Sequence, residues 1–326
     1  MRIAIDAMGG DNAPREIILG ALAAKENLGI EICLVGVPEI INGELDKLKY
    51  KTKIEIIPAK EVIGMDEHPG TAVRRKKESS IVVATKLVKN GEADALISAG
   101  STGAQMAAAL FYLGRIKEVE RPAIVTVFPS PKGKVVMLDS GANADAKATH
   151  LIQFAQMGSI YAEKVLHIQN PRIGLLNIGS EETKGNELTL AAYQMLKEKA
   201  SLNFIGNVEG RELLSGVADV IVCDGFVGNV VLKFAEGLVG SLFFMIKKEI
   251  EMNITRKIGA LLVRPAFMSI KKQLDYNEYG GAPLLGVDGI SIICHGSSKA
   301  KAIASAVRMA KECVESDFVG KIKETI

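Results

Sequence analysis

Residues 93–112 read ADALISAGSTGAQMAAALFY, and this stretch indicates how the chain folds. Its first part, 95–98, is a short apolar run of the kind that forms a buried strand. A glycine-containing turn follows, and from residue 102 apolar residues recur at the three- and four-residue spacing of a helix. A strand that ends in a polar turn and leads directly into a helix is the repeating unit of an α/β protein.

The same alternation extends along nearly the whole chain. Strands are predicted at 2–6, 31–36, 54–57, 95–98, 123–128, 135–138, 172–176, 202–205, 219–223 and 290–294. Helices are predicted at 14–27, 71–90, 102–112, 147–164, 187–199, 227–251 and 298–315. Several strands are continuous apolar runs, which is typical of parallel strands covered on both faces. The sequence therefore predicts an α/β fold with parallel sheets in a three-layer architecture.

The composition agrees with this class. Of 326 residues, 48% are hydrophobic, only 5% are aromatic and 32 are glycine, as expected for aliphatic strands beneath alanine-rich helices. Forty Lys and Arg against 38 Asp and Glu leave a net charge of +2, which argues against a nucleic-acid partner because such proteins carry a large basic excess. Cys33, Cys223, Cys294 and Cys313 are far apart among apolar residues, which predicts reduced thiols in the core.

One segment, 238–272, departs from the rhythm of strands and helices. Large apolar residues alternate there with basic groups such as Arg264, Lys271 and Lys272, which predicts a protruding amphipathic helical hairpin. Such a hairpin either rests on anionic lipid or packs against a second subunit, and the sequence leaves both open. The residues expected to contact a membrane are Leu242, Phe243, Phe244, Leu261, Leu262 and Phe267.

We expect no secretion and no membrane span. Asp6 interrupts the apolar start at the point where a signal peptide would continue. The uncharged stretch 237–246 has about half the length that a span requires.

Glycine-containing polar turns follow five of the predicted strands, after residues 6, 98, 177, 223 and 294. In an open α/β sheet such turns lie beyond the carboxyl ends of the strands, where ligands bind. Glycine lets the backbone approach a ligand, and a helix N-terminus favours an anion, so the five turns together predict a phosphate site. Neither a Walker sequence nor a GxGxxG helix start is present, which disfavours ATP and NAD. The acids near the turns include Asp139 and equally suit helix caps, so we expect no metal.

Four residues near these turns are candidates for the chemistry. Lys184 lies in a glycine-flanked loop where it either reaches a phosphate or is solvated. Asn229 either polarises a carbonyl or caps a helix, and Lys233 follows one turn later. His295, at a strand end, either shuttles a proton or is merely hydrogen-bonded. The other expected substrate-binding residues are Asp6, Gly9, Gly10, Asp11, Ser98, Gly100, Ser101, Thr102, Asn177, Ser180 and Asp224.

A run of four cations, Arg74, Arg75, Lys76 and Lys77, is expected in one helical turn. It is either a solvated face or a site for an acidic macromolecule or a phosphorylated tether, because the remaining charge of the chain is balanced.

Long runs of sequence carry a resemblance to a known family. They are DAMGGD (6–11), HPGTAVRRKKESS (68–80), ADALISAGSTGA (93–104), RPAIVTVFP (121–129), LDSGAN (138–143), QFAQMGSIYA (153–162), GLLNIGSEETKGNE (174–187), GNVEGRE (206–212), VCDGFVGNVVLKFAEG (222–237) and YGGAPLLGVDG (279–289). Over almost its whole length the chain resembles the bacterial phosphate acyltransferases of phospholipid synthesis. Ser101 departs from the family pattern, where asparagine is more usual.

The resemblance implies a fold similar to phosphotransacetylases and to isocitrate and isopropylmalate dehydrogenases, with two subdomains, a cleft between them and a homodimer. We expect subdomains at 1–135 with 281–326, and at 136–280. It implies transfer of a long-chain acyl group from an acyl-[acyl-carrier-protein] thioester to inorganic phosphate, without a cofactor. It also implies a cytoplasmic protein at the inner face of the membrane, which hands its acyl phosphate to an integral-membrane glycerol-3-phosphate acyltransferase.

Within that reaction, we expect Lys184 and the turn 98–102 to bind phosphate, Asn229 to stabilise the oxyanion and His295 to protonate the leaving sulfur. The four cations at 74–77 would bind the carrier protein. Two other functions stay open: a phosphotransacetylase that uses acyl-CoA, and a non-catalytic, membrane-peripheral scaffold for the carrier protein. An oxidoreductase on the related dehydrogenase fold is a more distant third.

Overall fold

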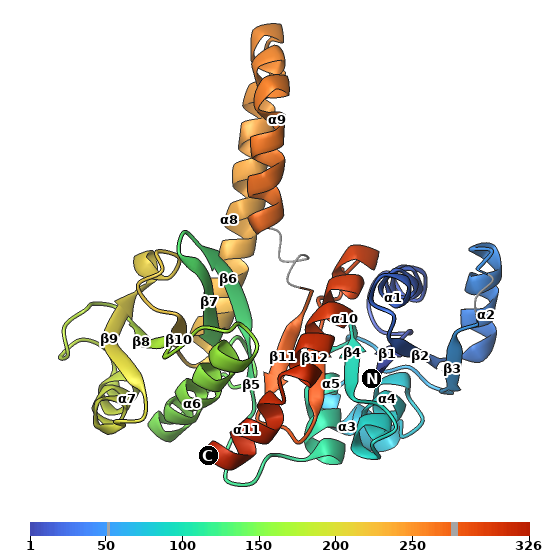
Figure 1. Cartoon of the computed structure of the whole chain (residues 1–326), viewed down its shortest axis with the longest axis horizontal. Coiled ribbons are helices and arrows are strands. Elements are labelled where there is room, and N and C mark those ends of the chain that lie inside the picture. Colours follow the sequence, from blue (N-terminus) through green and yellow to red (C-terminus); the bar gives the residue numbers. More distant parts are fainter. Residues whose placement is uncertain (51–52, 275–279) are drawn as a thin grey trace.

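The structure, a computed structural model, describes residues 1–50, 53–274 and 280–326, without the side chains of Lys271 and Lys272. It contains two sheets that stand side by side, each flanked by helices (Figure 1). Strands of one sheet are ordered β3-β2-β1-β4-β12-β11-β5, and those of the other β6-β7-β10-β8-β9. The α/β class predicted from the sequence is confirmed.

The seven-stranded sheet is built from both ends of the chain. Its parallel strands are β1 (Arg2–Asp6), β2 (Glu31–Gly36), β3 (Glu55–Pro58), β4 (Ala95–Ser98) and β12 (Ile290–Ile293). The antiparallel β11 (Ala282–Leu285) joins β12 to the short β5 (Ala123–Ile124). The sequence did not predict β11, because its four residues include a proline and show no strand period.

The five-stranded sheet takes the middle of the chain. It consists of β6 (Thr126–Ser130), β7 (Gly133–Leu138), β8 (Arg172–Asn177), β9 (Asn203–Glu209) and β10 (Val220–Val222), with only β6 antiparallel. The single strand predicted at 123–128 is therefore two strands, since the chain crosses from one sheet to the other at Val125. The expected subdomain boundaries stay a prediction.

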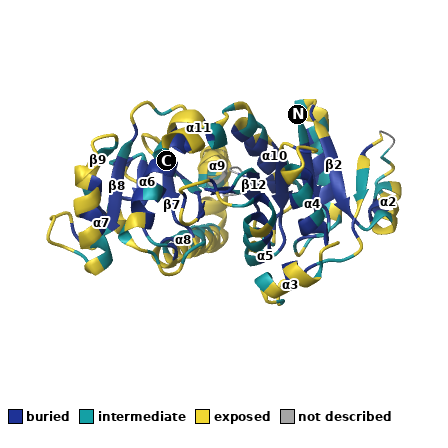
Figure 2. Cartoon of the chain, turned by 90° about the horizontal axis from the view of Figure 1, so that it is seen from below, coloured by how far each residue is buried: buried dark blue, intermediate teal, exposed yellow. Residues whose placement is uncertain are grey.

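Helices cover both sheets (Figure 2). They are α1 (Arg15–Leu28), α2 (Pro38–Lys47), α3 (Pro69–Arg75), α4 (Ser80–Lys89), α5 (Thr102–Ala108), α6 (Ala148–Lys164), α7 (Glu187–Glu198), α8 (Gly225–Glu251), α9 (Ile254–Leu274), α10 (Ala300–Glu315) and α11 (Phe318–Thr325). A π-helical turn, η1 (Ala109–Leu113), extends α5, and η2 (Gly210–Glu212) is a 3₁₀ turn. The sequence did not predict α2 or α11.

The helix predicted at 71–90 is wrong, because the chain forms α3 and α4 with a break between them. Around the break, the backbone N–H of Lys60 donates to the carbonyl of Glu78, and Ser79 forms an isolated bridge with Glu61. These bonds hold the backbone in an extended conformation that a helix excludes.

One core cluster extends across both sheets. It includes Ile3 and Ile97 from one sheet, Val136 and Val222 from the other, and Phe154 of α6. The C-terminal helix α11 also packs on α6, where the ring of Phe318 meets that of Tyr161 edge-on at 6.1 Å between centroids. All four cysteines are buried, as predicted.

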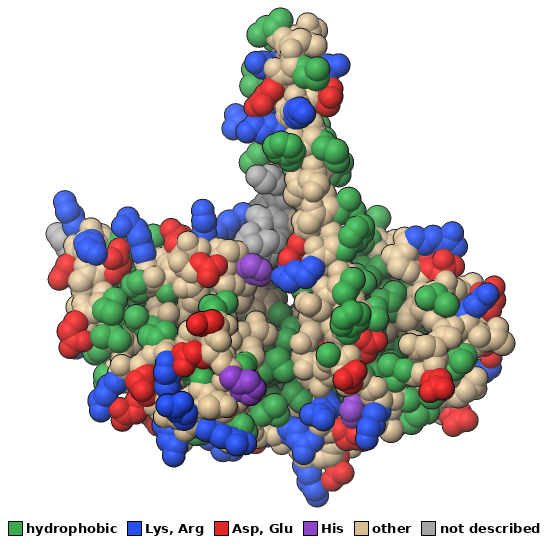
Figure 3. Space-filling model, turned by 180° about the vertical axis from the view of Figure 1, so that it is seen from behind, with side chains coloured by type: hydrophobic (Ala, Val, Ile, Leu, Met, Phe, Trp, Pro, Cys, Tyr) green, Lys and Arg blue, Asp and Glu red, His purple; other side chains and the backbone are tan. Residues whose placement is uncertain are grey.

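The predicted hairpin is present as α8 and α9, which project away from both sheets (Figure 1). It is longer than the predicted 238–272, since α8 begins at Gly225 beside the sheet. Hydrophobic side chains are spread along it (Figure 3). Leu242, Phe244, Leu261 and Leu262 are exposed. By length and composition alone, α8 could cross a membrane; the expectation that no segment does so stays a prediction.

Candidate active site

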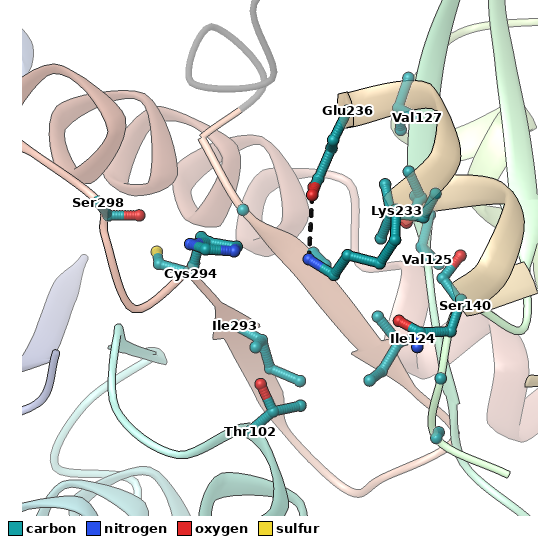
Figure 4. A pocket seen from close by; sticks show the side chains of 18 of the residues that line it. Thr102, Ile124, Val125, Val127, Ser140, Lys233, Glu236, Ile293, Cys294 and Ser298 are labelled. Carbon is teal, nitrogen blue, oxygen red and sulfur yellow. Dashed lines mark hydrogen bonds and ion pairs between the residues drawn. The ribbon is translucent and has the colours of Figure 1, made fainter. Parts of the chain in front are cut away.

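A cavity of about 570 Å³ lies between the two sheets. Its walls come from α5, the crossing between β5 and β6, the loop after β7, the first part of α8, and the ends of β11 and β12 (Figure 4). The lining residues are Thr102, Gly103, Met106, Ile124, Val125, Thr126, Val127, Ser140, Gly141, Ala142, Asn229, Leu232, Lys233, Glu236, Gly280, Gly281, Ala282, Ile293, Cys294, His295, Ser298 and Ala302. Aliphatic side chains predominate, with a few polar groups among them, as is usual for a ligand site.

The buried carboxylate of Asp139 shapes one wall of this cavity. Its Oδ1 accepts bonds from the backbone N–H groups of Ile124 (3.0 Å), Gly141 (3.3 Å) and Ala142 (3.0 Å). Its Oδ2 accepts from the backbone N–H of Asn143 at 2.7 Å and from Nδ2 of that residue at 2.9 Å. Burial raises the pKa of Asp139, and the hydrogen bonds from Ile124, Ala142 and Asn143 oppose this shift. Asp139 thus holds the loop after β7 in place.

The sequence pattern indicates only a possible helix cap or metal ligand at Asp139 and does not predict that this residue belongs to the site. The signal that could have identified it is the position of this acid at a strand end, immediately before the small residues Ser140, Gly141 and Ala142.

Two glycines bring the start of α8 onto this loop. A Cβ atom at Gly228 would lie 1.9 Å from the carbonyl oxygen of Asp139, and one at Gly225 would lie 2.6 Å from that of Asn143. Asp224 caps the helix, its Oδ1 accepting the N–H of Val227 at 2.9 Å, and does not line the cavity. The close approach carries the next turns of α8 into the cavity wall.

Those turns contribute Asn229, Lys233 and Glu236 to the lining of the cavity. Figure 4 shows the side chains of Lys233 and Glu236 pointing toward each other. A Cβ atom at Gly141 would lie 3.5 Å from Oδ1 of Asn229. The ammonium of Lys233 lies 3.0 Å from Oε2 of Glu236. Of the described residues that line the cavity, Lys233 alone is a lysine or arginine. This cation beside an apolar wall suits a ligand that has an anionic end and a hydrocarbon part.

His295 and Cys294 lie at the end of β12. Nδ1 of His295 accepts the backbone N–H of Ser297 at 3.2 Å and lies 2.8 Å from the hydroxyl of that serine. A neutral ring therefore carries its proton on Nε2. The thiol of Cys294 donates to the carbonyl of Gly280 at 3.3 Å, and burial raises its pKa to about 12. It stays protonated at neutral pH, which does not suit a nucleophile.

The N-terminal group of predicted residues forms a compact cluster outside the lining of the cavity. Ser98 donates to Oδ2 of Asp6 at 2.7 Å and accepts the N–H of Gly100 at 3.0 Å. Burial raises the pKa of Asp6. A Cβ atom at Gly9 would lie 2.8 Å from the nitrogen of Gly100, so Gly9 is explained by close packing.

The neighbouring residues Gly10, Asp11 and Ser101 have local partners. Gly10 has a φ of 105° and faces the carbonyl of Gly296, which accepts the N–H of Asp11 at 2.8 Å. The hydroxyl of Ser101 caps α5 by accepting the N–H of Ala104 at 3.4 Å. Of the turn 98–102, Thr102 lines the cavity.

Lys184, Asn177 and Ser180 belong to the end of β8 and the loop after it. Nδ2 of Asn177 donates to the carbonyl of Lys184 at 3.0 Å, and Lys184 and Ser180 are exposed. None of the three lines the cavity. The structure therefore brings together Thr102, Asn229, Lys233 and His295, and leaves Lys184 on a separate loop; the expected role of Lys184 stays a prediction.

The cations at 74–77 do not form the single helical turn that the sequence predicts, because α3 ends at Arg75. Lys76 turns inward, pairs with Glu67 at 2.6 Å and donates to the carbonyl of Val62 at 2.8 Å. The guanidinium of Arg74 lies over the ring of Phe111, 4.7 Å from its centroid. Arg75 and Lys77 are exposed. Binding of a carrier protein by this group stays a prediction.

Three comparisons relate the chain as a whole to known proteins. A family model described as "Fatty acid synthesis protein" matches residues 1–321. The chain is 63% identical to the phosphate acyltransferase of Desulfitobacterium hafniense (strain DSM 10664 / DCB-2), covering 100% of this chain and 98% of that protein. It is 60% identical to the phosphate acyltransferase of Heliobacterium modesticaldum, again with 100% and 98% coverage.

Solved structures share the fold at low sequence identity. A phosphotransacetylase from Streptococcus pyogenes superposes with a TM-score of 0.64 at 18% identity, covering 96% of this chain and 94% of that one. A branched-chain phosphotransacylase from Enterococcus faecalis gives a TM-score of 0.61 at 13% identity, with 96% and 99% coverage. Fold and sequence both agree with the resemblance seen in the motifs, which is confirmed. This chain is an acyltransferase that belongs to the fatty acid synthesis protein family, the family of the phosphate acyltransferases.

Proposed function

We propose that this enzyme transfers a long-chain acyl group from the thioester of an acyl-carrier protein to inorganic phosphate, and so forms acyl phosphate for phospholipid synthesis. The observation that carries the proposal is one cavity in which an aliphatic wall, the ammonium of Lys233 and the ring of His295 face the same space. An acyl thioester and a phosphate together require an apolar surface, a cation and a proton donor.

In this mechanism a phosphate oxygen attacks the thioester carbonyl directly. The new C–O bond forms a tetrahedral oxyanion, and the C–S bond then breaks to release the phosphopantetheine thiolate. Phosphate is already an anion at neutral pH, so neither a protein nucleophile nor a metal ion is required. The enzyme mainly positions two reactants and neutralises their charge.

Each polar group of the cavity has a role in the proposed reaction. Lys233 binds the phosphate in exchange for part of its pairing with Glu236, since it is the lysine at the cavity wall. The amide of Asn229 donates to the oxyanion. His295, as the imidazolium ion, donates its Nε2 proton to the leaving sulfur and becomes a neutral ring, while the contact of Nδ1 with the Ser297 hydroxyl orients it.

We further propose that the protein is cytoplasmic and works as a homodimer on the inner face of the membrane. There it passes its labile product to an integral-membrane glycerol-3-phosphate acyltransferase. Exposed apolar side chains along α8 and α9 support a surface that lipid or a second subunit covers. The exposed Arg75 and Lys77 support an acidic carrier protein as donor.

The test is phosphate-dependent release of thiol from a long-chain acyl-carrier protein by the purified enzyme, with the product trapped by hydroxylamine. Acyl-CoA serves as the comparison donor. Release of thiol and capture of product with the carrier donor would support the proposal. Equal turnover with acyl-CoA would favour the phosphotransacetylase reaction. Carrier binding without turnover, unaffected by phosphate, would favour a scaffold.

The role of Asn229 has its own test. Removing one oxyanion donor commonly lowers kcat roughly 100- to 1,000-fold. We expect Asn229→Ala to fall in that range with little change in KM for phosphate. A loss of less than about tenfold would contradict the assignment.

A further inference from the structure

We propose that a long acyl chain leaves the cavity along α8 and that its distal part lies in the groove between α8 and α9. The inference rests on the proposed function, because it takes the acyl group as the ligand of the cavity. It gives the hairpin a part in substrate binding in addition to any contact with lipid or a second subunit.

The groove is a second hollow in the described part of the chain, with a volume of about 450 Å³. Its lining is mainly apolar and includes Phe243, Ile250 and Phe267, and its charged lining residues are exposed. Phe243 and Phe267, which the sequence assigned to membrane contact, both line it and are half-buried. The other lining residues are Ile246, Lys247, Glu251, Lys257, Ala260, Leu261, Arg264 and Met268. A lining that is mainly apolar, with exposed charged side chains among it, suits a hydrocarbon chain.

One face of α8 connects the cavity to the groove. The cavity wall uses helix positions 229, 232, 233 and 236, and the groove uses positions 243, 246, 247, 250 and 251. These positions recur at the three- and four-residue spacing that places side chains on one side of a helix. Both hollows therefore lie along the same side of one continuous helix.

Gly240 lies on that face between the two hollows. It follows Glu236 by four residues and precedes Phe243 by three. A Cβ atom at Gly240 would have no neighbour within 4 Å, so the space above it is open. Glu236 and Phe243 are about 10 Å apart along the helix axis. A long chain spans this gap over the glycine, whereas a short chain ends within the cavity.

The size of the cavity also favours this exit. Sites of about 300 to 1,000 Å³ hold one ligand of drug size. The cavity, at about 570 Å³, must admit a phosphate, the thioester and the end of the pantetheine arm. Little of that volume is left for the distal carbons of a long chain.

The test uses octyl phosphonate and hexadecyl phosphonate as probes, each below its micelle concentration, with binding measured by calorimetry on the full-length protein. Each buried methylene tightens binding about fourfold. Burial of only three of the additional methylenes of the hexadecyl probe would therefore tighten its binding roughly sixtyfold. We expect the wild type to bind the hexadecyl probe at least that much more tightly. Gly240→Leu fills the gap and should reduce the ratio to below about tenfold, with unchanged affinity for the octyl probe.

Ser241→Leu is the matched control, because the next helix position is exposed and points about 100° away. It should keep the wild-type ratio. Equal ratios in Gly240→Leu and wild type would overturn the proposal. The proposal would also be overturned if Gly240→Leu changed the molecular mass in light scattering but left the affinity ratio intact. A second copy of the chain would then cover the groove. Thiol release from a short-chain carrier donor tests the proposed function separately, because that donor does not need the groove.

Discussion

Replacing Asp139 tests whether a single carboxylate holds the wall of the cavity. In Asp139→Ala, five N–H donors lose their acceptor. The N–H of Ile124 is buried, and leaving it unpaired costs about 1–3 kcal/mol. The other four are partly buried and regain some bonds to water. Removal of the buried charge offsets part of the cost of these lost bonds. We therefore expect the free energy of unfolding to fall by about 3–5 kcal/mol.

Two variants serve as comparisons. Asp139→Asn keeps an oxygen for the three donors at Oδ1 and leaves those of Asn143 facing an amide, so we expect a loss of about 1–2 kcal/mol. Asp224→Ala removes a carboxylate that accepts one bond at a helix cap, which costs about 1 kcal/mol.

The assays are urea unfolding and phosphate-dependent thiol release, the latter at a temperature where each variant is folded. We expect Asp139→Ala to lower kcat/KM more than Asp224→Ala does, because Ser140, Gly141 and Ala142 line the cavity. An Asp139→Ala protein within about 1 kcal/mol of the wild type would refute the reasoning, since the five bonds would then contribute no more than one cap.

Three other predictions concern the site and its supports. Lys233→Ala should raise KM for phosphate at least about tenfold, as measured by thiol release, whereas Lys184→Ala should have a smaller effect; the reverse order would favour the role expected from the sequence. Gly228→Ala should lower the free energy of unfolding by at least about 1–3 kcal/mol, because its Cβ would meet the carbonyl of Asp139 at 1.9 Å. Gly237→Ala, in open space on the same helix, should instead gain up to about 1 kcal/mol, and equal effects would contradict the packing explanation. Burial raises the pKa of Asp6, so its contribution to stability is present below the unfolded pKa and is lost as pH rises through the folded pKa. In thermal melts, the stability of Asp6→Asn relative to the wild type should therefore increase as pH rises over that range. A difference in melting temperature that does not change with pH would contradict this prediction.

Much of the fold follows from local sequence pattern. Apolar runs such as 95–98 and 172–176 become strands because their alternatives leave large aliphatic side chains in water. The misses have tertiary causes. β11 forms because β12 and β5 provide partners on either side, and the break between α3 and α4 exists because β-type bonds from residues 60 and 61 reach it.

The candidate site was harder to predict from the sequence than the fold. Strand-end turns predicted where ligands bind, and Thr102, Asn229, Lys233 and His295 do line the cavity. However, all the turns looked alike, and the pattern did not distinguish a turn that faces the cavity from one that packs against its neighbour. Ser98 and Gly100 bond within their own cluster with Asp6, and Lys184 lies on a loop two strands away from β7.

The sequence by itself determined the α/β class, the hairpin and the family, because hydrophobic period and long motifs are properties of neighbouring residues. Only the tertiary structure decided which side chains share the cavity. That selection depends on distances between residues far apart in the chain: the loop after β7 is held by Asp139, and α8 reaches it because Gly225 and Gly228 have no side chain. No pattern along the chain records such an approach, since it arises only when β7 and β10, the strands that precede this loop and α8, pair side by side in one sheet.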